Sequence, residues 1–175
     1  MSLMSLKESN AMLINTKRAQ PLSFHFSWEE AETTSHRDID NTIPPELYSA
    51  ILSTSDGMER VRSVLSRPIH INSWYRSPEL NASIGSSRTS QHPKGEAVDF
   101  ICPSYGTPLQ AVKELVKYEE FLEFDQLILE HSWVHISFCS IPNRNPRGQV
   151  LTLLRDRSYA TGITSLDGIP LTSTS

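Results

Sequence analysis

Apolar residues at helical spacing, together with residues that favour helix starts, predict four helical regions. Ser27 is followed three residues later by Glu30, which is the spacing of a capping box. A longer apolar stripe covers about residues 45–66 after a pair of prolines, and its break at Ser55-Asp56-Gly57 predicts two helical pieces. Two further helices are expected to begin at Ser77-Pro78 and at Thr107-Pro108, the second ending near residue 121.

Short apolar runs, some of them alternating with polar residues, predict five strands. The last residues of one run and the first of the next are separated only by Glu130-His131-Ser132, so a hairpin is the simplest connection. Helices and strands follow one another without regular βαβ alternation, which favours the α+β class. We therefore expect a small single domain with a central antiparallel sheet flanked by helices. The strands are expected over residues 69–74, 97–102, 125–129, 133–138 and 149–154.

Length and composition fit one folded domain. The chain has 175 residues, of which 38% are hydrophobic and 21% are charged, close to the averages of soluble globular proteins. Residues 1–24 show no sustained hydrophobic period, and the end of the chain is rich in Ser and Thr. We expect an N-terminal arm over 1–24, a domain over 25–160 and a flexible tail over 161–175.

Charge and hydropathy exclude some classes of partner. The net charge of −4 argues against a ligand recognised through its phosphates, so no nucleic acid is expected. The apolar runs are far shorter than a membrane span, and the start of the chain lacks a signal-peptide h-region. We therefore expect no membrane partner and synthesis in the cytoplasm. Neither Cys102 nor Cys139 belongs to a CxxC pair, so two buried free thiols are expected.

Two segments carry residues suited to metal binding. His92 lies in a loop, and Asp99 follows it within an apolar strand, where it must be exposed, ion-paired or bound to a metal. His135 lies in a second apolar strand, where a neutral imidazole can offer one nitrogen to zinc. Two histidines and one aspartate make three ligands. A fourth position is then left for water, as a hydrolytic zinc site requires.

Hydrolysis also needs a group that accepts a proton from the attacking water. Glu130 is nearest in sequence to His135, at the end of the strand that enters the hairpin, and His131 is the alternative. Arg76 follows the strand expected at 69–74, and its positive charge suits a developing oxyanion or a substrate carboxylate.

Four blocks stand in order along the chain: residues 75–81 (YRSPELN), 90–100 (SQHPKGEAVDF), 124–128 (FDQLI) and 133–137 (WVHIS). With residues 39–42 (IDNT), they resemble the M15 family of zinc peptidases from about Phe26 to Arg147. The resemblance is closer to the phage and prophage branch, which is related to D-alanyl-D-alanine carboxypeptidases and L-alanyl-D-glutamate endolysins.

This resemblance implies the fold, cofactor and activity of an M15 peptidase. The fold would be the D,D-peptidase/hedgehog-like one, with zinc held by His92, Asp99 and His135. Arg76 would contact the substrate or the oxyanion. The protein would be a metallopeptidase that hydrolyses an amide bond in peptidoglycan stem peptides, as a carboxypeptidase or an endolysin-type endopeptidase. A phage or prophage origin, with delivery to the cell wall by other proteins, is also implied.

The sequence departs from the family's pattern at one point. Many relatives place an acidic base three residues before the last ligand, where this chain has Ser132. Glu130 is then the preferred base and His131 the second choice. If neither serves, the chain would be a non-catalytic phage structural or cell-wall-binding module with the same fold. Four arginines are interpreted either as a solvated face or as a patch that attracts anionic cell-wall polymer: Arg144, Arg147, Arg155 and Arg157.

Overall fold

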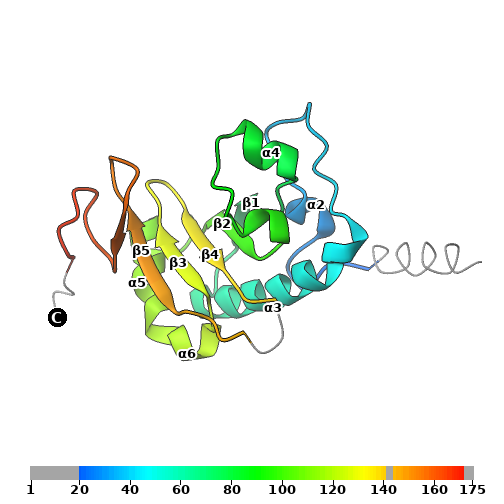
Figure 1. The fold of residues 1–175 in the computed structure, drawn as a ribbon. Coiled ribbons are helices and arrows are strands. Elements are labelled where there is room, and N and C mark those ends of the chain that lie inside the picture. Colours follow the sequence, from blue (N-terminus) through cyan, green and yellow to red (C-terminus); the bar gives the residue numbers. More distant parts are fainter. Residues whose placement is uncertain (1–19, 141–143, 172–175) are drawn as a thin grey trace, which may run out of the picture.

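A six-stranded sheet with helices against one face forms the framework of the computed structural model, which describes residues 20–140 and 144–171 (Figure 1). The strands lie across the sheet in the order β1-β2-β4-β3-β5-β6. Their bounds are His70–Ser73 (β1), Ala97–Ile101 (β2), Gln126–Leu129 (β3), Val134–Ser137 (β4), Gln149–Leu153 (β5) and Tyr159–Thr161 (β6).

The α+β class is confirmed, but the sheet is mixed rather than antiparallel throughout. β3 and β4 form the expected hairpin, in which Gln126 pairs with Ser137. β5 pairs in parallel with β3, because β4 ends and β5 begins at the same end of the sheet. β6, which the sequence pattern does not predict, pairs antiparallel with β5. Alternation along a strand predicts which side chains are buried, but it carries no information about the direction of the neighbouring strand.

The helices begin where the sequence has helix-start residues. Ser27 and Thr107 each form a capping box, and the Ser77 hydroxyl accepts a hydrogen bond from the backbone of its helix. Within the described residues the α-helices span Trp28–Ala31 (α2), Tyr48–Leu65 (α3), Pro78–Ser83 (α4), Pro108–Leu115 (α5) and Glu119–Leu122 (α6), and 3-10 turns span Pro45–Leu47 (η1), His92–Lys94 (η2) and Val116–Tyr118 (η3).

The predicted break in the long helix at residues 55–57 is wrong, since α3 runs through it without interruption. Two polar side chains at or beside the expected break are buried but satisfied: Thr54 donates to the carbonyl of Gly95, and Ser55 donates to the carbonyl of Leu52. Gly57 is needed for close packing instead. A Cβ at this position would lie 2.6 Å from the aromatic ring of Phe138, which is itself buried.

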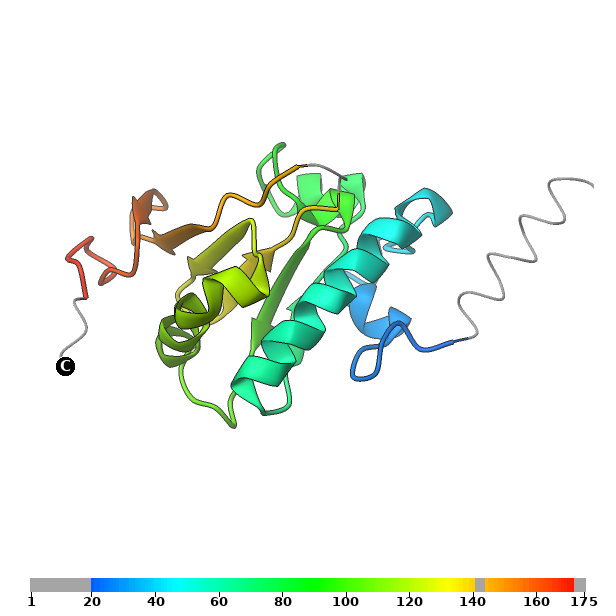
Figure 2. The ribbon, with the colours of Figure 1, turned by 90° about the horizontal axis from the view of Figure 1, so that it is seen from below.

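One face of the sheet is buried and the other carries the polar side chains. The paired residues Val98 and Ile136 are fully buried in the hydrophobic core, into which α3 and α5 also send side chains. Figure 2 shows α3 and α5 lying against this face. Successive residues of a strand point to opposite faces, so Asp99 and His135 project from the face that these helices leave uncovered.

Asp125 links the start of β3 to the segment that leads into β5. Its side chain is fully buried and accepts hydrogen bonds from the backbone N–H and the guanidinium of Arg147, and it also pairs with Arg144. Burial raises the pKa of Asp125, but the hydrogen bonds from Arg147 outweigh it and lower the pKa to about 2. The thiol of Cys139 donates to the same carboxylate and is only half-buried, whereas Cys102 is buried as expected; both are free.

Some features of the chain ends are described and others are not. Leu22, in the expected arm, is buried in the core, and Thr164, in the expected tail, is buried and forms an isolated β-bridge with Pro170. Residues 1–19 and 172–175 lie outside the described residues, and the domain boundaries stay predictions. Across residues 20–140 and 144–171, no helix is both long enough and apolar enough to span a membrane.

We expect Gly57→Ala to destabilise the protein by about 1–3 kcal/mol, although alanine is the better helix former by about 1 kcal/mol. The added methyl group would meet the Phe138 ring. The Arg60 guanidinium lies 5.8 Å from the centre of this ring and helps to hold it in place. Urea unfolding measures the effect. In a Phe138→Leu background the same glycine substitution should cost much less, and a single variant as stable as the wild type would contradict the packing argument.

The Asp125 pair predicts a defined loss of stability in acid. Because the pKa of about 2 lies below the ordinary value of 3.8, ionised Asp125 contributes its full stabilisation above about pH 4 and loses it as the pH falls towards 2. The free energy of unfolding, measured between pH 2 and 6, should therefore change more steeply with pH for the wild type than for Asp125→Asn. The exposed control Asp38→Asn should keep the wild-type dependence. Equal slopes for the wild type and Asp125→Asn would count against the pair.

Candidate active site

A row of paired residues brings functional side chains together across the sheet. Ser73 of β1 pairs with Asp99 of β2, Asp99 pairs with His135 of β4, and His135 pairs with Ile128 of β3. Directly opposed residues of neighbouring strands project from the same face of a sheet. Asp99 and His135 are thus held side by side by the backbone, and the Nδ1 atom of His135 lies 2.8 Å from Oδ1 of Asp99.

His92 approaches the same carboxylate from the turn η2, just before β2. Gly95 ends this turn in the left-handed region at φ 73°, and a Cβ there would lie 2.9 Å from Ile51 of α3, so glycine lets the turn sit on the helix. The His92 side chain is only 2% exposed, and its Nδ1 lies 2.6 Å from the backbone carbonyl of Trp74. A carbonyl only accepts hydrogen bonds, so Nδ1 carries the proton and Nε2 faces Asp99 at 3.3 Å.

Asp99 is the centre of a charged group in the middle of a strand. Burial favours the neutral acid, but the charges and hydrogen bonds of His92 and His135 hold its pKa well below the ordinary value. The guanidinium of Arg76 forms an ion pair with Oδ2 of Asp99, and its Nε donates to the Ser73 hydroxyl at 2.8 Å. Arg76 therefore lies at the site and pairs with Asp99, while its expected contact with the substrate or the oxyanion stays a prediction.

The arrangement of His92, Asp99 and His135 fits a metal ion. Each offers one ligand atom, and these atoms all lie within 4.8 Å of one another. Burial lowers the pKa of His92 despite the opposing effect of Asp99, which favours the neutral imidazole. In that form the lone pair of Nε2 faces a carboxylate oxygen, and two acceptors in contact need a cation between them. Two imidazoles and a carboxylate are a donor set suited to zinc.

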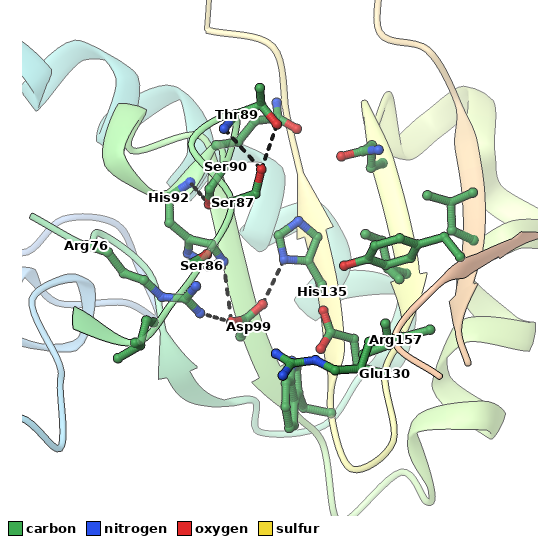
Figure 3. A pocket seen from close by; sticks show the side chains of 18 of the residues that line it. Arg76, Ser86, Ser87, Thr89, Ser90, His92, Asp99, Glu130, His135 and Arg157 are labelled. Atoms are coloured by element: carbon green, nitrogen blue, oxygen red, sulfur yellow. Dashed lines mark hydrogen bonds and ion pairs between the residues drawn. The ribbon is translucent and has the colours of Figure 1, made fainter. Parts of the chain in front are cut away.

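Glu130 and His131, the two candidate bases, differ in position. Glu130 follows β3, closes the hairpin through its N–H to the carbonyl of Trp133 at 3.1 Å, and lines the groove beside the cluster. Figure 3 shows its carboxylate next to His135. Burial, and secondarily the charge of Asp99, raises the pKa of Glu130. His131 is exposed in the turn and is not among the groove residues.

The cluster opens into a groove of about 650 Å³ (Figure 3). Loop residues 84–87 and 89–91 line one part of it, and β5 with the turn after it lines another. Sequence reasoning did not identify three residues of this site as functional: Ser73, Tyr159 and, as an individual side chain, Arg157. Strand alternation places Ser73 on the same face of the sheet as Asp99 only when the pairing register of β1 and β2 is known. Tyr159 belongs to β6, which had no signal of its own.

Comparison with known protein families agrees with this geometry. A family model described as Peptidase M15 matches residues 21–137. The chain belongs to the M15 peptidase family. M15 peptidases are zinc-dependent, and the matched segment contains the whole cluster as well as Glu130 and Arg76. No curated protein matches the chain.

For this M15 peptidase we expect one zinc ion per chain, lost when a ligand is removed. His92→Ala and His135→Ala should each weaken zinc binding by about 100-fold or more, since even the residues that support metal ligands are worth 10–100-fold. Metal analysis after gel filtration, together with the rise in melting temperature on adding zinc, measures this. His36→Ala, in an exposed loop, is the control. Full zinc content in both cluster variants would exclude the site.

Proposed function

We propose that this chain is a zinc-dependent metallopeptidase that hydrolyses an amide bond in peptidoglycan stem peptides. The observation that carries the proposal is the His92, Asp99 and His135 cluster at the base of a groove that also contains Glu130. Membership of the M15 family supports a peptidase, and the resemblance to the phage and prophage branch supports the cell-wall substrate. Delivery to the cell wall by other phage proteins belongs to the same proposal.

The chain's own residues supply the proton transfers. When bound, zinc would polarise the scissile carbonyl and lower the pKa of a water molecule. Glu130 would accept a proton from the attacking water and pass it to the departing amine. Its raised pKa suits both steps, because a carboxylate with a pKa nearer neutrality accepts the proton more readily and still releases it to an amine.

Arg76 has two proposed tasks. Its ion pair with Asp99 and its hydrogen bond to Ser73 fix the guanidinium at the edge of the groove. The remaining N–H groups of the fork are then available for the oxyanion or a nearby substrate carbonyl. His92 and His135 are held by the Trp74 carbonyl and by Asp99, so the ligands need little rearrangement to bind the ion.

The groove volume of about 650 Å³ lies within the common range of ligand pockets, about 300–1,000 Å³, so a short peptide segment can bind there. It is lined by both polar loop residues and apolar strand residues such as Ile128 and Leu151. Stem peptides combine apolar alanyl groups with carboxylates and match this mixture. The proposal covers cleavage at the end of the peptide or within it, as a carboxypeptidase or an endopeptidase.

Glu130→Gln should bind zinc as the wild type does and lose about 100-fold or more of its turnover, because an amide cannot accept the proton. Release of amino groups from purified peptidoglycan measures turnover, and mass spectrometry of the products shows which bond is cut. His131→Ala should stay close to wild type.

The reverse pattern would transfer the role of base to His131, and full activity in both variants would exclude both residues. If the zinc-loaded wild type releases no amine from any peptidoglycan, the protein is the non-catalytic cell-wall module instead.

A further inference from the structure

Part of the groove wall comes from a segment outside the family match, which ends at residue 137. β5 and the hairpin to β6 contribute Leu151, Leu153, Arg157 and Tyr159 to the groove. Figure 1 shows this hairpin at the edge of the sheet beyond β3. These residues therefore add to the site a wall that the matched segment alone does not provide.

The four arginines that the sequence groups together divide into two kinds. Arg144 and Arg147 pair with the buried Asp125, and Arg155 pairs with Asp167 at 3.2 Å on the surface. Among the described residues, the side chain of Arg157 makes no hydrogen bond or ion pair, yet it lines the groove. The four arginines thus differ in their partners: three are paired with aspartates, and one presents an unpaired guanidinium to the site.

The backbone at Arg157 is also unusual. Its N–H donates to the carbonyl of Leu154 at 3.0 Å, and the N–H of Leu154 donates to the carbonyl of Ser158 at 2.9 Å, which closes the hairpin. Arg157 occupies the left-handed region at φ 69°. Glycine or asparagine adopts this conformation with less strain, and hairpins of this kind favour glycine at the left-handed position. An arginine held there at a cost in strain points to a role for its side chain.

The charges of the groove indicate what that role is. Asp99 and Glu130 both line the groove, and Arg76 forms an ion pair with Asp99. A zinc ion held by the cluster would offset the charge of Asp99, and Arg157 would offset that of Glu130 for an acidic peptide in the same groove. Arg157 is the remaining groove arginine, and Figure 3 shows its guanidinium on the side of the groove where Glu130 lies.

We propose that Arg157 binds a carboxylate of the peptide substrate close to the scissile bond, and so selects acidic stem peptides. This inference rests on the proposed function and specifies its substrate. The planar fork of arginine matches a carboxylate through two parallel hydrogen bonds. Tyr159, on the same wall, provides a neighbouring hydroxyl: burial, with the charges of Glu130 and Asp99, raises its pKa and keeps it protonated as a donor.

Two carboxylates of a stem peptide have the required chemistry, the C-terminal carboxylate and the free carboxylate of the glutamyl residue. A synthetic stem pentapeptide ending in D-alanyl-D-alanine can be made in three forms: with both groups free, with the C-terminal group amidated, and with the glutamyl group amidated. Affinity is measured by calorimetry with the zinc-loaded protein in a Glu130→Gln background, which slows turnover, and KM and kcat are measured separately with Glu130 intact.

We expect amidation of one of the two carboxylates to weaken binding to the wild type by about tenfold or more. Arg157→Asn should bind the acid and the amide equally, with the change in KM rather than in kcat. Its melting temperature should equal or exceed that of the wild type, because asparagine tolerates the left-handed backbone. Arg157→Lys should keep part of the preference. Arg155→Ala, on the same turn but paired with Asp167, should behave as wild type.

Each other outcome is decisive. The role of Arg157 would be overturned, and the proposed function left intact, by either of two results. In one, Arg157→Asn keeps the wild-type preference for the free carboxylate over the amide. In the other, a wild type that cleaves the peptide shows no such preference. A lower melting temperature together with loss of zinc in Arg157→Asn would show that Arg157 has a structural role, and would also overturn the proposal. Acid preference without cleavage would support Arg157 and refute the peptidase. A wild type that binds none of the three peptides would refute both.

Discussion

A carboxylate buried in the middle of a strand is the constraint around which this structure is organised. Asp99 lies in β2 with its side chain 7% exposed, where an unpaired negative charge would be very costly. Three side chains from separate parts of the chain meet this cost: Arg76 after β1, His92 before β2 and His135 on β4. The Arg76 ion pair and the two histidines satisfy this carboxylate, and the same histidines together with Asp99 form the candidate zinc site.

The two faces of the sheet have different roles, one in stability and the other in the chemistry of the site. The face covered by α3 and α5 carries the apolar core, so the opposite face is available for polar residues whose burial is incomplete. Backbone pairing between β2 and β4 fixes Asp99 against His135, and the Asp125 network fixes the segment leading to β5. The groove is therefore built on strands whose positions the core determines, which is the condition for a preorganised site.

Local sequence signals predicted the residues of the His92, Asp99 and His135 cluster and most of the elements, and they failed where distant contacts decide. The capping boxes at Ser27 and Thr107 depend on residues three apart, so they could be found from the sequence. Gly57 looked like a helix break because its partner, the Phe138 ring, lies far along the chain. The parallel pairing of β5 and the free guanidinium of Arg157 likewise depend on the assembled sheet, which no local pattern encodes.

X-ray absorption at the zinc edge tests the central claim most directly, because it reports the atoms around the ion without relying on activity. For the zinc-loaded protein we expect two imidazole nitrogens and carboxylate or water oxygens at about 2.0–2.2 Å, as His92, Asp99 and His135 would provide. His135→Ala, loaded at a zinc concentration high enough to offset its weaker binding, should show one imidazole fewer. A sulfur neighbour near 2.3 Å, or a spectrum unchanged by that substitution, would show that zinc binds elsewhere and contradict the account.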